Sequence, residues 1–96
     1  MPKRKRRVIL NGRKMSTRAH AHAHLSKKLK LPRWYGRNLD ALCDCLGGVA
    51  EPTVIVLFHA GAMKKSLGTY GTKLLSALSS MTGENPNLEL VVRERF

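Results

Sequence analysis

The stretch that decides the fold is residues 31–46, which read Leu31-Pro32-Arg33-Trp34-Tyr35-Gly36-Arg37-Asn38-Leu39-Asp40-Ala41-Leu42-Cys43-Asp44-Cys45-Leu46. Its second half, from Asn38 to Leu46, predicts a short helix, because three leucines recur at the spacing of one helical face. Asp40 and Asp44 are four residues apart and fall on the opposite side of that helix, where they face water. Two like charges at this spacing cost an isolated helix about 0.2–0.5 kcal/mol. The pair therefore favours a surface that meets a positively charged partner.

The same residues resemble the signature of the barstar family, the intracellular inhibitors of barnase-type ribonucleases. Nearly every position from Leu31 to Leu46 is in register with that signature. Weaker similarity in the order and length of elements extends from about Arg7 to Val92. The resemblance implies a stoichiometric, immunity-type inhibitor whose carboxylates occupy the active site of a ribonuclease and stand in for RNA phosphates.

The resemblance also implies which residues bind the enzyme. Asp44 would be the deepest anchor and Asp40 a second contact, since carboxylates form short, strong bonds with cationic side chains. Tyr35 matches an aromatic residue that packs on the enzyme, and Gly36 and Asn38 match residues that shape the loop. For the neighbouring aromatic residue, Trp34, we expect a place in the core, with Tyr35 left available for contact.

Three positions depart from the family pattern. Cys43, also a predicted contact position, stands where the family usually has a tryptophan, and Arg37 brings a positive charge beside the acidic pair. Ser79 and Ser80 stand where the family can supply a further acidic contact. These departures leave open a second hypothesis, a diverged barstar-like domain whose partner is not a nuclease.

Hydrophobic periodicity and turn residues predict the remaining elements. The expected strands are 7–10, 53–58 and 88–92. The expected helices are 17–29 with a Ser16 or Thr17 cap, 38–46, 60–67 and 72–81, the last two separated by Gly68 and Gly71. The run from Thr53 to Phe58 is apolar without alternation, which is typical of a strand covered on both faces. Together they predict an α/β, barstar-like domain over residues 7–96, with a three-stranded parallel sheet and about four helices, preceded by a basic, frayed tail over residues 1–6.

The charge of the chain supports a further alternative. Lys and Arg number 18 against 6 Asp and Glu, for a net charge of +12, and the first 37 residues contain 13 of these cations and no acid. Such a segment is typical of salt-sensitive, nonspecific phosphate binding. A basic RNA- or ribosome-associated protein therefore remains an alternative, although no familiar RNA-binding signature is present. Its predicted contacts are Lys3, Arg4, Lys5, Arg6 and Arg7.

Several other classes are not favoured. No signal peptide is visible and the longest apolar run, Val54–Phe58, is too short to cross a bilayer, so we expect a cytoplasmic protein without membrane contact.

Cys43 and Cys45 point apart on a helix, which predicts free thiols. His20 and His24 share a face at a zinc-binding spacing, but no third ligand is near in sequence, so we expect no metal site. No nucleophile with a base and an orienting acid can be assembled, so we expect neither catalytic residues nor a cofactor.

Overall fold

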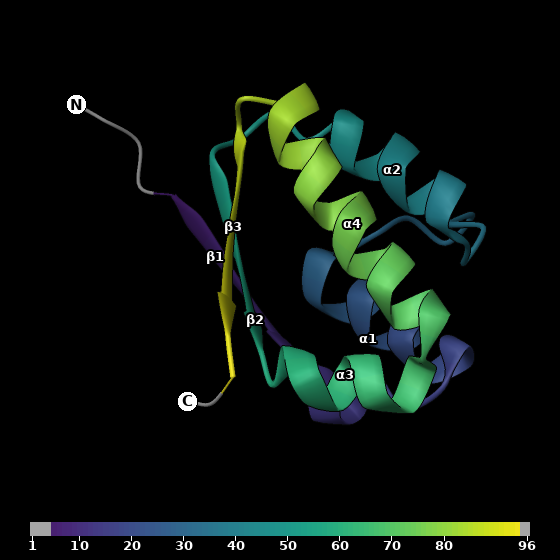
Figure 1. Ribbon diagram of the computed structural model, residues 1–96. Helices are drawn as coiled ribbons and strands as arrows, with labels where there is room; N and C mark the ends of the chain where they lie inside the picture. The colour runs from purple at the N-terminus through teal and green to yellow at the C-terminus, as the bar shows by residue number, and fades with distance from the viewer. Residues whose placement is uncertain (1–4, 95–96) are drawn as a thin grey trace.

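The computed structural model describes residues 5–94 and shows a three-stranded parallel sheet with four α-helices (Figure 1). The strands, in the order β1-β2-β3, are β1 (Arg6–Asn11), β2 (Thr53–Phe58) and β3 (Leu88–Arg93). The helices are α1 (Arg18–Leu29), α2 (Leu39–Gly47), α3 (Ala60–Leu67) and α4 (Thr69–Glu84), and a short 3-10 helix, η1 (Gly12–Lys14), follows β1. Each pair of neighbouring strands is joined by helices, as parallel pairing requires. The predicted α/β, barstar-like class is confirmed.

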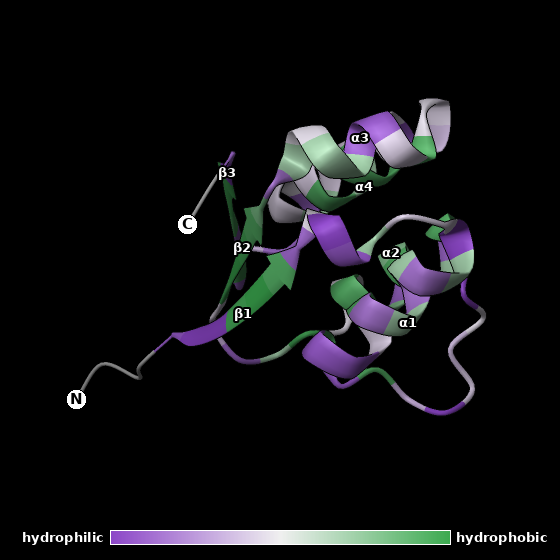
Figure 2. Cartoon of the chain, turned by 90° about the horizontal axis from the view of Figure 1, so that it is seen from below, coloured by the Kyte–Doolittle hydropathy of each residue, from purple (hydrophilic) through white to green (hydrophobic). Residues whose placement is uncertain are grey.

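All four α-helices lie on one side of the sheet (Figure 1), and the core fills the space between. In the sheet register, Val8 is opposite Ile55 and Leu10 is opposite Leu57, so these side chains project from the same face toward the helices. Figure 2 shows the strands in hydrophobic colours along most of their length. Burial of this face against the helices is the main apolar stabilisation of the domain.

The expected strand covered on both faces is present in the middle of β2, although helices cover only one of its faces (Figure 1). Val56 points away from the helices and is nevertheless only 3% exposed. Its register partners on the flanking strands are Ile9 and Val91, which shield it from both sides. A central strand can therefore carry a continuous apolar run with one layer of helices, because its own neighbours bury the outer side chains.

The predicted starts of α1, α2 and α3 are confirmed, whereas α4 begins at Thr69 rather than about residue 72 and ends at Glu84 rather than residue 81. The side chain of Thr17 caps α1 by accepting from the backbone N–H of His20, with 3.1 Å between N and Oγ1. Gly71 was expected to separate two helices, but it lies inside α4. A Cβ at this position would lie 3.0 Å from the Cα of Lys64, so the glycine allows α4 to approach α3 closely. The break falls at Gly68 alone, whose φ is +62°.

The sheet begins one residue earlier than predicted. Arg6 opens β1, and the ammonium group of Lys5 lies 2.6 Å from a carboxylate oxygen of Glu89 on β3. The remainder of the predicted frayed tail, residues 1–4, lies outside the described residues, and the division at residue 6 stays a prediction. Within residues 5–94, no helix has the length and hydropathy needed to span a membrane.

Candidate protein-binding site

Helix α2 presents its two aspartates to solvent because its leucines are buried. Leu42 and Leu46 are fully buried in the core, and α2 packs against α4. Asp40 and Asp44 are exposed on the outer side of the same helix, which confirms the orientation predicted from their spacing. The hydrophobic stripe therefore sets the direction in which the two carboxylates point.

Neither aspartate is neutralised by a neighbouring cation in the described part of the chain. The ion pairs among residues 5–94 are Lys5–Glu89 and Arg6–Glu51, and both lie away from α2. Burial, followed by the charges of Asp40 and Asp44, raises the pKa of the half-buried Cys43 thiol. The two carboxylates thus form a local negative field on an exposed helix face, free to meet a positively charged partner.

The loop before α2 is tied to the first turn of the helix through Asn38. Its side-chain oxygen accepts from the backbone N–H of Ala41 at 2.7 Å, and its amide nitrogen donates to the carbonyl of Gly36 at 3.3 Å. Between them, Arg37 adopts a left-handed conformation with φ of 54°, which is uncommon for a residue other than glycine. A Cβ on Gly36 would lie 3.3 Å from the Cβ of Ala41, so the loop packs closely on the helix. This geometry fixes the position of the turn that carries Asp40.

The expected orientations of the two aromatic residues in this loop are reversed. Tyr35 is buried, with 6% of its surface exposed, whereas Trp34 is 78% exposed. The hydroxyl of Tyr35 lies 2.6 Å from Nδ1 of His22, which is itself buried. A hydroxyl can both donate and accept, so it satisfies a buried imidazole whichever tautomer is present, whereas an indole N–H can only donate. Tyr35 is therefore an anchor of the loop, and Trp34 is the aromatic side chain that faces solvent.

His22 extends this anchor to a third element. Its Nε2 lies 2.6 Å from the hydroxyl of Tyr70 on α4, so one imidazole joins α1, the loop and α4. Burial lowers the pKa of His22, and the charge of Arg37 lowers it further, which keeps the ring neutral. Burial also raises the pKa of Tyr35, so its hydroxyl stays protonated. A neutral ring uses one nitrogen as donor and the other as acceptor, and each tyrosine takes the complementary role.

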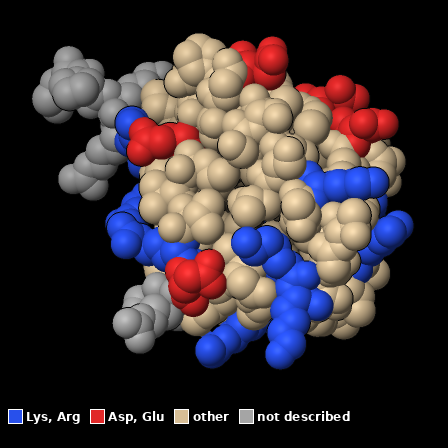
Figure 3. Space-filling model, viewed as in Figure 1, with Lys and Arg blue, Asp and Glu red and all other residues tan. Residues whose placement is uncertain are grey.

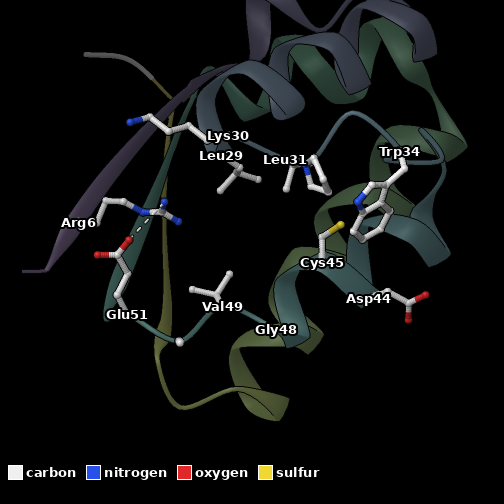
Figure 4. A pocket seen from close by; sticks show the side chains of 12 residues that line it. Arg6, Leu29, Lys30, Leu31, Trp34, Asp44, Cys45, Gly48, Val49 and Glu51 are labelled. Carbon is white, nitrogen blue, oxygen red and sulfur yellow. Dashed lines mark ion pairs between the residues drawn. The ribbon is translucent and has the colours of Figure 1, made fainter.

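An open hollow of about 500 Å³ lies beside Asp44, and Trp34 forms part of its wall (Figure 4). Its apolar lining comes from the end of α1, from α2 itself and from the segments that flank α2, and includes Leu29, Leu31, Pro32, Cys45 and Val49. The Arg6–Glu51 ion pair, with 3.6 Å between Nη1 and Oε1, lies on the side of the hollow opposite Trp34 and Asp44 (Figure 4). An apolar side chain of a partner would fit here, directly next to the acidic pair.

Other residues singled out in the sequence have separate positions. Ser79 and Ser80 are exposed on α4, the helix that packs on α2. Of the predicted nucleic-acid contacts, Lys5 and Arg6 are engaged by Glu89 and Glu51, and Arg7 is exposed. Lys3 and Arg4 lie outside the described residues.

The histidines and cysteines do not assemble a metal site in the region that the structure covers. No group of three His, Cys, Asp or Glu side chains in residues 5–94 is placed to hold a metal ion. Nε2 of His24 accepts from the backbone N–H of Asn11 at 2.9 Å, and Cys43 and Cys45 are free thiols, as expected.

The fold and this helix define a class: a small α/β protein that offers exposed carboxylates and an exposed tryptophan on one surface, features suited to binding another protein. A family model described as "Barstar (barnase inhibitor)" matches residues 6–93, and the chain therefore belongs to the barstar family. It is also similar to a protein of Bacillus subtilis (strain 168) named "Putative ribonuclease inhibitor YrdF". The two are 36% identical over 80 residues, which is 82% of this chain and 88% of that protein. Family membership supports a ribonuclease-inhibitor role, and with it a ribonuclease as the protein partner.

Proposed function

We propose that this protein is a stoichiometric inhibitor that blocks the active site of a ribonuclease with Asp40 and Asp44. A site that binds a phosphodiester is built from cationic donors, and a carboxylate forms charge-assisted bonds with the same donors. The observation that carries the proposal is the exposure of both carboxylates on α2 without a cation paired to them among residues 5–94. In this role the protein would act in the cytoplasm as the immunity partner of a toxic ribonuclease, without enzymatic activity of its own.

We include the exposed Trp34 in the proposed contact surface. Tyr35 is buried, so it supports this surface from within and does not contact the partner. Large aromatic side chains next to charged anchors contribute strongly to protein interfaces. Trp34 is 78% exposed and lines the same hollow as Asp44, so it offers the apolar area that Cys43, a small half-buried residue, does not. Tyr35, Gly36 and Asn38 act by holding the loop in the geometry that Asp40 and Trp34 require.

The direct test is the cleavage of a dinucleotide by a barnase-type ribonuclease, titrated with this protein at physiological salt. A dinucleotide is too short for a basic protein to protect by coating it. We expect activity to fall to zero at one equivalent of inhibitor. Asp44→Ala should weaken binding by about 2–5 kcal/mol, because it leaves the cations of the enzyme buried without their partner.

Glu84→Ala is the matched control, since it removes one exposed carboxylate at the end of α4. It changes the net charge by the same amount as Asp44→Ala and should leave the dissociation constant unchanged. An equal dissociation constant for Asp44→Ala and the wild type would place the contact elsewhere. No inhibition of any barnase-type enzyme would favour a diverged domain with a partner of another kind.

A further inference from the structure

A group of lysines surrounds one imidazole on the side of the molecule formed by η1 and α1. Lys14 ends η1, Lys27 and Lys28 lie in the last turn of α1, and all three are exposed. Nε2 of His24 accepts from the backbone N–H of Asn11 at 2.9 Å, which places the start of η1 against α1, and Lys27 and Lys28 follow His24 by three and four residues on the same face of the helix. Burial lowers the pKa of His24, and the charges of Lys28, Lys14 and Lys27 lower it further, as expected for three cations close to one side chain.

No carboxylate offsets this charge within the two elements. Neither η1 nor α1 contains Asp or Glu, and the ion pairs found among residues 5–94 involve Lys5 and Arg6 instead. The dipole of α1 accounts for a cation at its C-terminus, at about 0.3–1 kcal/mol. It does not account for Lys14, nor for Arg13 beside it, which belong to another element. The stability of α1 therefore explains only part of the positive charge in this cluster.

The surroundings of the cluster suit a phosphate backbone better than a lipid surface. The large exposed hydrophobic residues in the described structure are Ile9, Trp34 and Val92, and none lies on η1 or α1. Binding to a membrane surface is strengthened by apolar side chains that insert among the lipids, and these elements expose none of that size. Charge without apolar or stacking groups is typical of backbone contacts that carry no base preference.

We propose that Arg13, Lys14, Lys27 and Lys28 form a surface that binds the phosphate backbone of RNA. This activity goes beyond the inhibition of a ribonuclease and uses none of the residues of the α2 site. Figure 3 shows, on the face it draws, more Lys and Arg side chains in the lower half of the molecule than in the upper half, with acidic side chains at the top and upper right and also at the left and lower left. None of the four proposed residues lines the hollow beside Asp44, so RNA at the η1–α1 surface would leave α2 free for the enzyme.

The test is the binding of a labelled oligouridylate of about twelve nucleotides, measured by fluorescence anisotropy between about 50 and 200 mM salt. Each phosphate contact on a single strand contributes about 0.7 to the slope of log K against log salt. The triple variant Lys14→Gln/Lys27→Gln/Lys28→Gln should therefore lower the slope by about 2 and weaken binding about a hundredfold at 0.1 M salt.

The matched control is Lys64→Gln/Lys65→Gln/Lys73→Gln, which removes three exposed lysines from α3 and α4. It produces the same change in net charge and should weaken binding much less. Equal losses in the two triple variants would overturn the proposal, because binding would then follow net charge alone. Competition by polyglutamate as strong as that by RNA, at equal charge, would also overturn it, since the surface would then take acidic proteins.

The ring protons of His24 locate the binding in the wild-type protein. RNA phosphates beside the lysines should offset their charge and raise the pKa of His24, as followed by NMR. A His24 signal that does not respond at saturating RNA would place the binding elsewhere and contradict the proposal.

Two further measurements separate this activity from inhibition. Asp44→Ala should bind the oligouridylate at least as well as the wild type, since it removes a negative charge. The η1–α1 triple variant should still inhibit dinucleotide cleavage if the α2 mechanism is correct, so either activity can fail without the other. Loss of inhibition in that variant would show that the surface is not separate from the enzyme-binding site.

Discussion

The imidazole of His22 holds the loop before α2 in place through two tyrosine hydroxyls. Removal of one of these hydroxyls should lower the free energy of unfolding. Tyr35→Phe would leave Nδ1 of His22 without its partner in a buried position. We expect a loss of about 1–3 kcal/mol in the free energy of unfolding, because a buried polar group then lacks a hydrogen bond. Urea denaturation measures the loss.

Trp34→Ala makes the complementary change on the neighbouring residue. Since Trp34 is exposed, its removal should change stability by less than about 0.5 kcal/mol. The same variant should weaken binding to the ribonuclease by at least about tenfold, as loss of an aromatic anchor does. If Trp34→Ala destabilised the protein and left affinity unchanged, the exposed tryptophan would not be a contact residue.

Buried histidines should also make the protein less stable in mild acid. Burial lowers the pKa values of His22 and His24 below the ordinary value of 6.5. As the pH falls below about 6.5, the unfolded chain binds protons that the folded protein resists, so the free energy of unfolding decreases. Above that pH both states are neutral at these sites and the stabilisation is complete. The interval from pH 7.5 to 5.5 brackets the ordinary pKa of a histidine side chain.

His24→Gln tests the contribution of one ring. The glutamine side chain can still accept from the N–H of Asn11, but it does not titrate. Urea midpoints measured at pH 7.5 and 5.5 should therefore differ less in this variant than in the wild type. A pH dependence identical to that of the wild type would contradict the role of His24, whatever the contribution of His22.

Sequence spacing predicted the candidate site only where local geometry decides it. The i,i+4 spacing of Asp40 and Asp44 opposite the leucines of α2 fixes their exposure, because a short helix with one buried face leaves no other choice. The orientations of Trp34 and Tyr35 could not be read in this way. They depend on His22, which lies thirteen residues earlier in the chain than Tyr35. The buried Nδ1 of His22 needs a hydrogen-bond partner, and the hydroxyl of Tyr35 supplies it.

At the scale of elements, the packing of α3 on α4 depends on one glycine. Gly71→Ala would place a Cβ 3.0 Å from the Cα of Lys64 and 3.1 Å from the Cβ of Leu67, so the two helices would have to separate. We expect a destabilisation of about 1–3 kcal/mol, as for other overpacked sites. Thermal or urea unfolding at neutral pH checks the prediction.

Gly83 in the last turn of α4 provides the control for this substitution. A Cβ at Gly83 meets nothing within 4 Å, and alanine favours helix over glycine by up to about 1 kcal/mol. Gly83→Ala should therefore stabilise the protein slightly, or leave it unchanged. Stabilisation by both substitutions would show that α3 and α4 do not pack as closely as described.

The helix boundaries show which features could be predicted from the sequence and which could not. The caps of α1 and α2 are local, because Thr17 and Asn38 accept from N–H groups only three residues away. Gly71 was interpreted as a break because glycine lowers helix propensity. Its actual role is contact with α3, and such a contact between two packed helices is not visible from local propensity.

At the scale of the whole molecule, a net charge of +12 is combined with an acidic contact helix, and the range of each field decides which one a ribonuclease meets. The Debye length is about 30 Å at 10 mM salt and about 8 Å at 150 mM. The protein measures 41 × 31 × 21 Å, so an approaching enzyme meets the field of the whole molecule at low salt and mainly that of the nearest face at physiological salt. The sign of electrostatic steering should therefore change with ionic strength.

For a strongly basic ribonuclease, we expect the association rate constant, measured by stopped-flow fluorescence, to rise from about 10 to 150 mM salt as repulsion by the whole molecule is screened. It should fall again at higher salt, when the attraction to Asp40 and Asp44 is screened as well. The variant Lys64→Gln/Lys65→Gln/Lys73→Gln removes distant positive charge, so association should be faster at 10 mM and unchanged at 150 mM. Asp44→Ala should act chiefly on dissociation, because loss of a buried charged contact changes the dissociation rate more than the encounter. An association rate that declines steadily from the lowest salt would mean that the acidic face dominates at every distance, and the net charge would then place no limit on which ribonucleases this protein can meet.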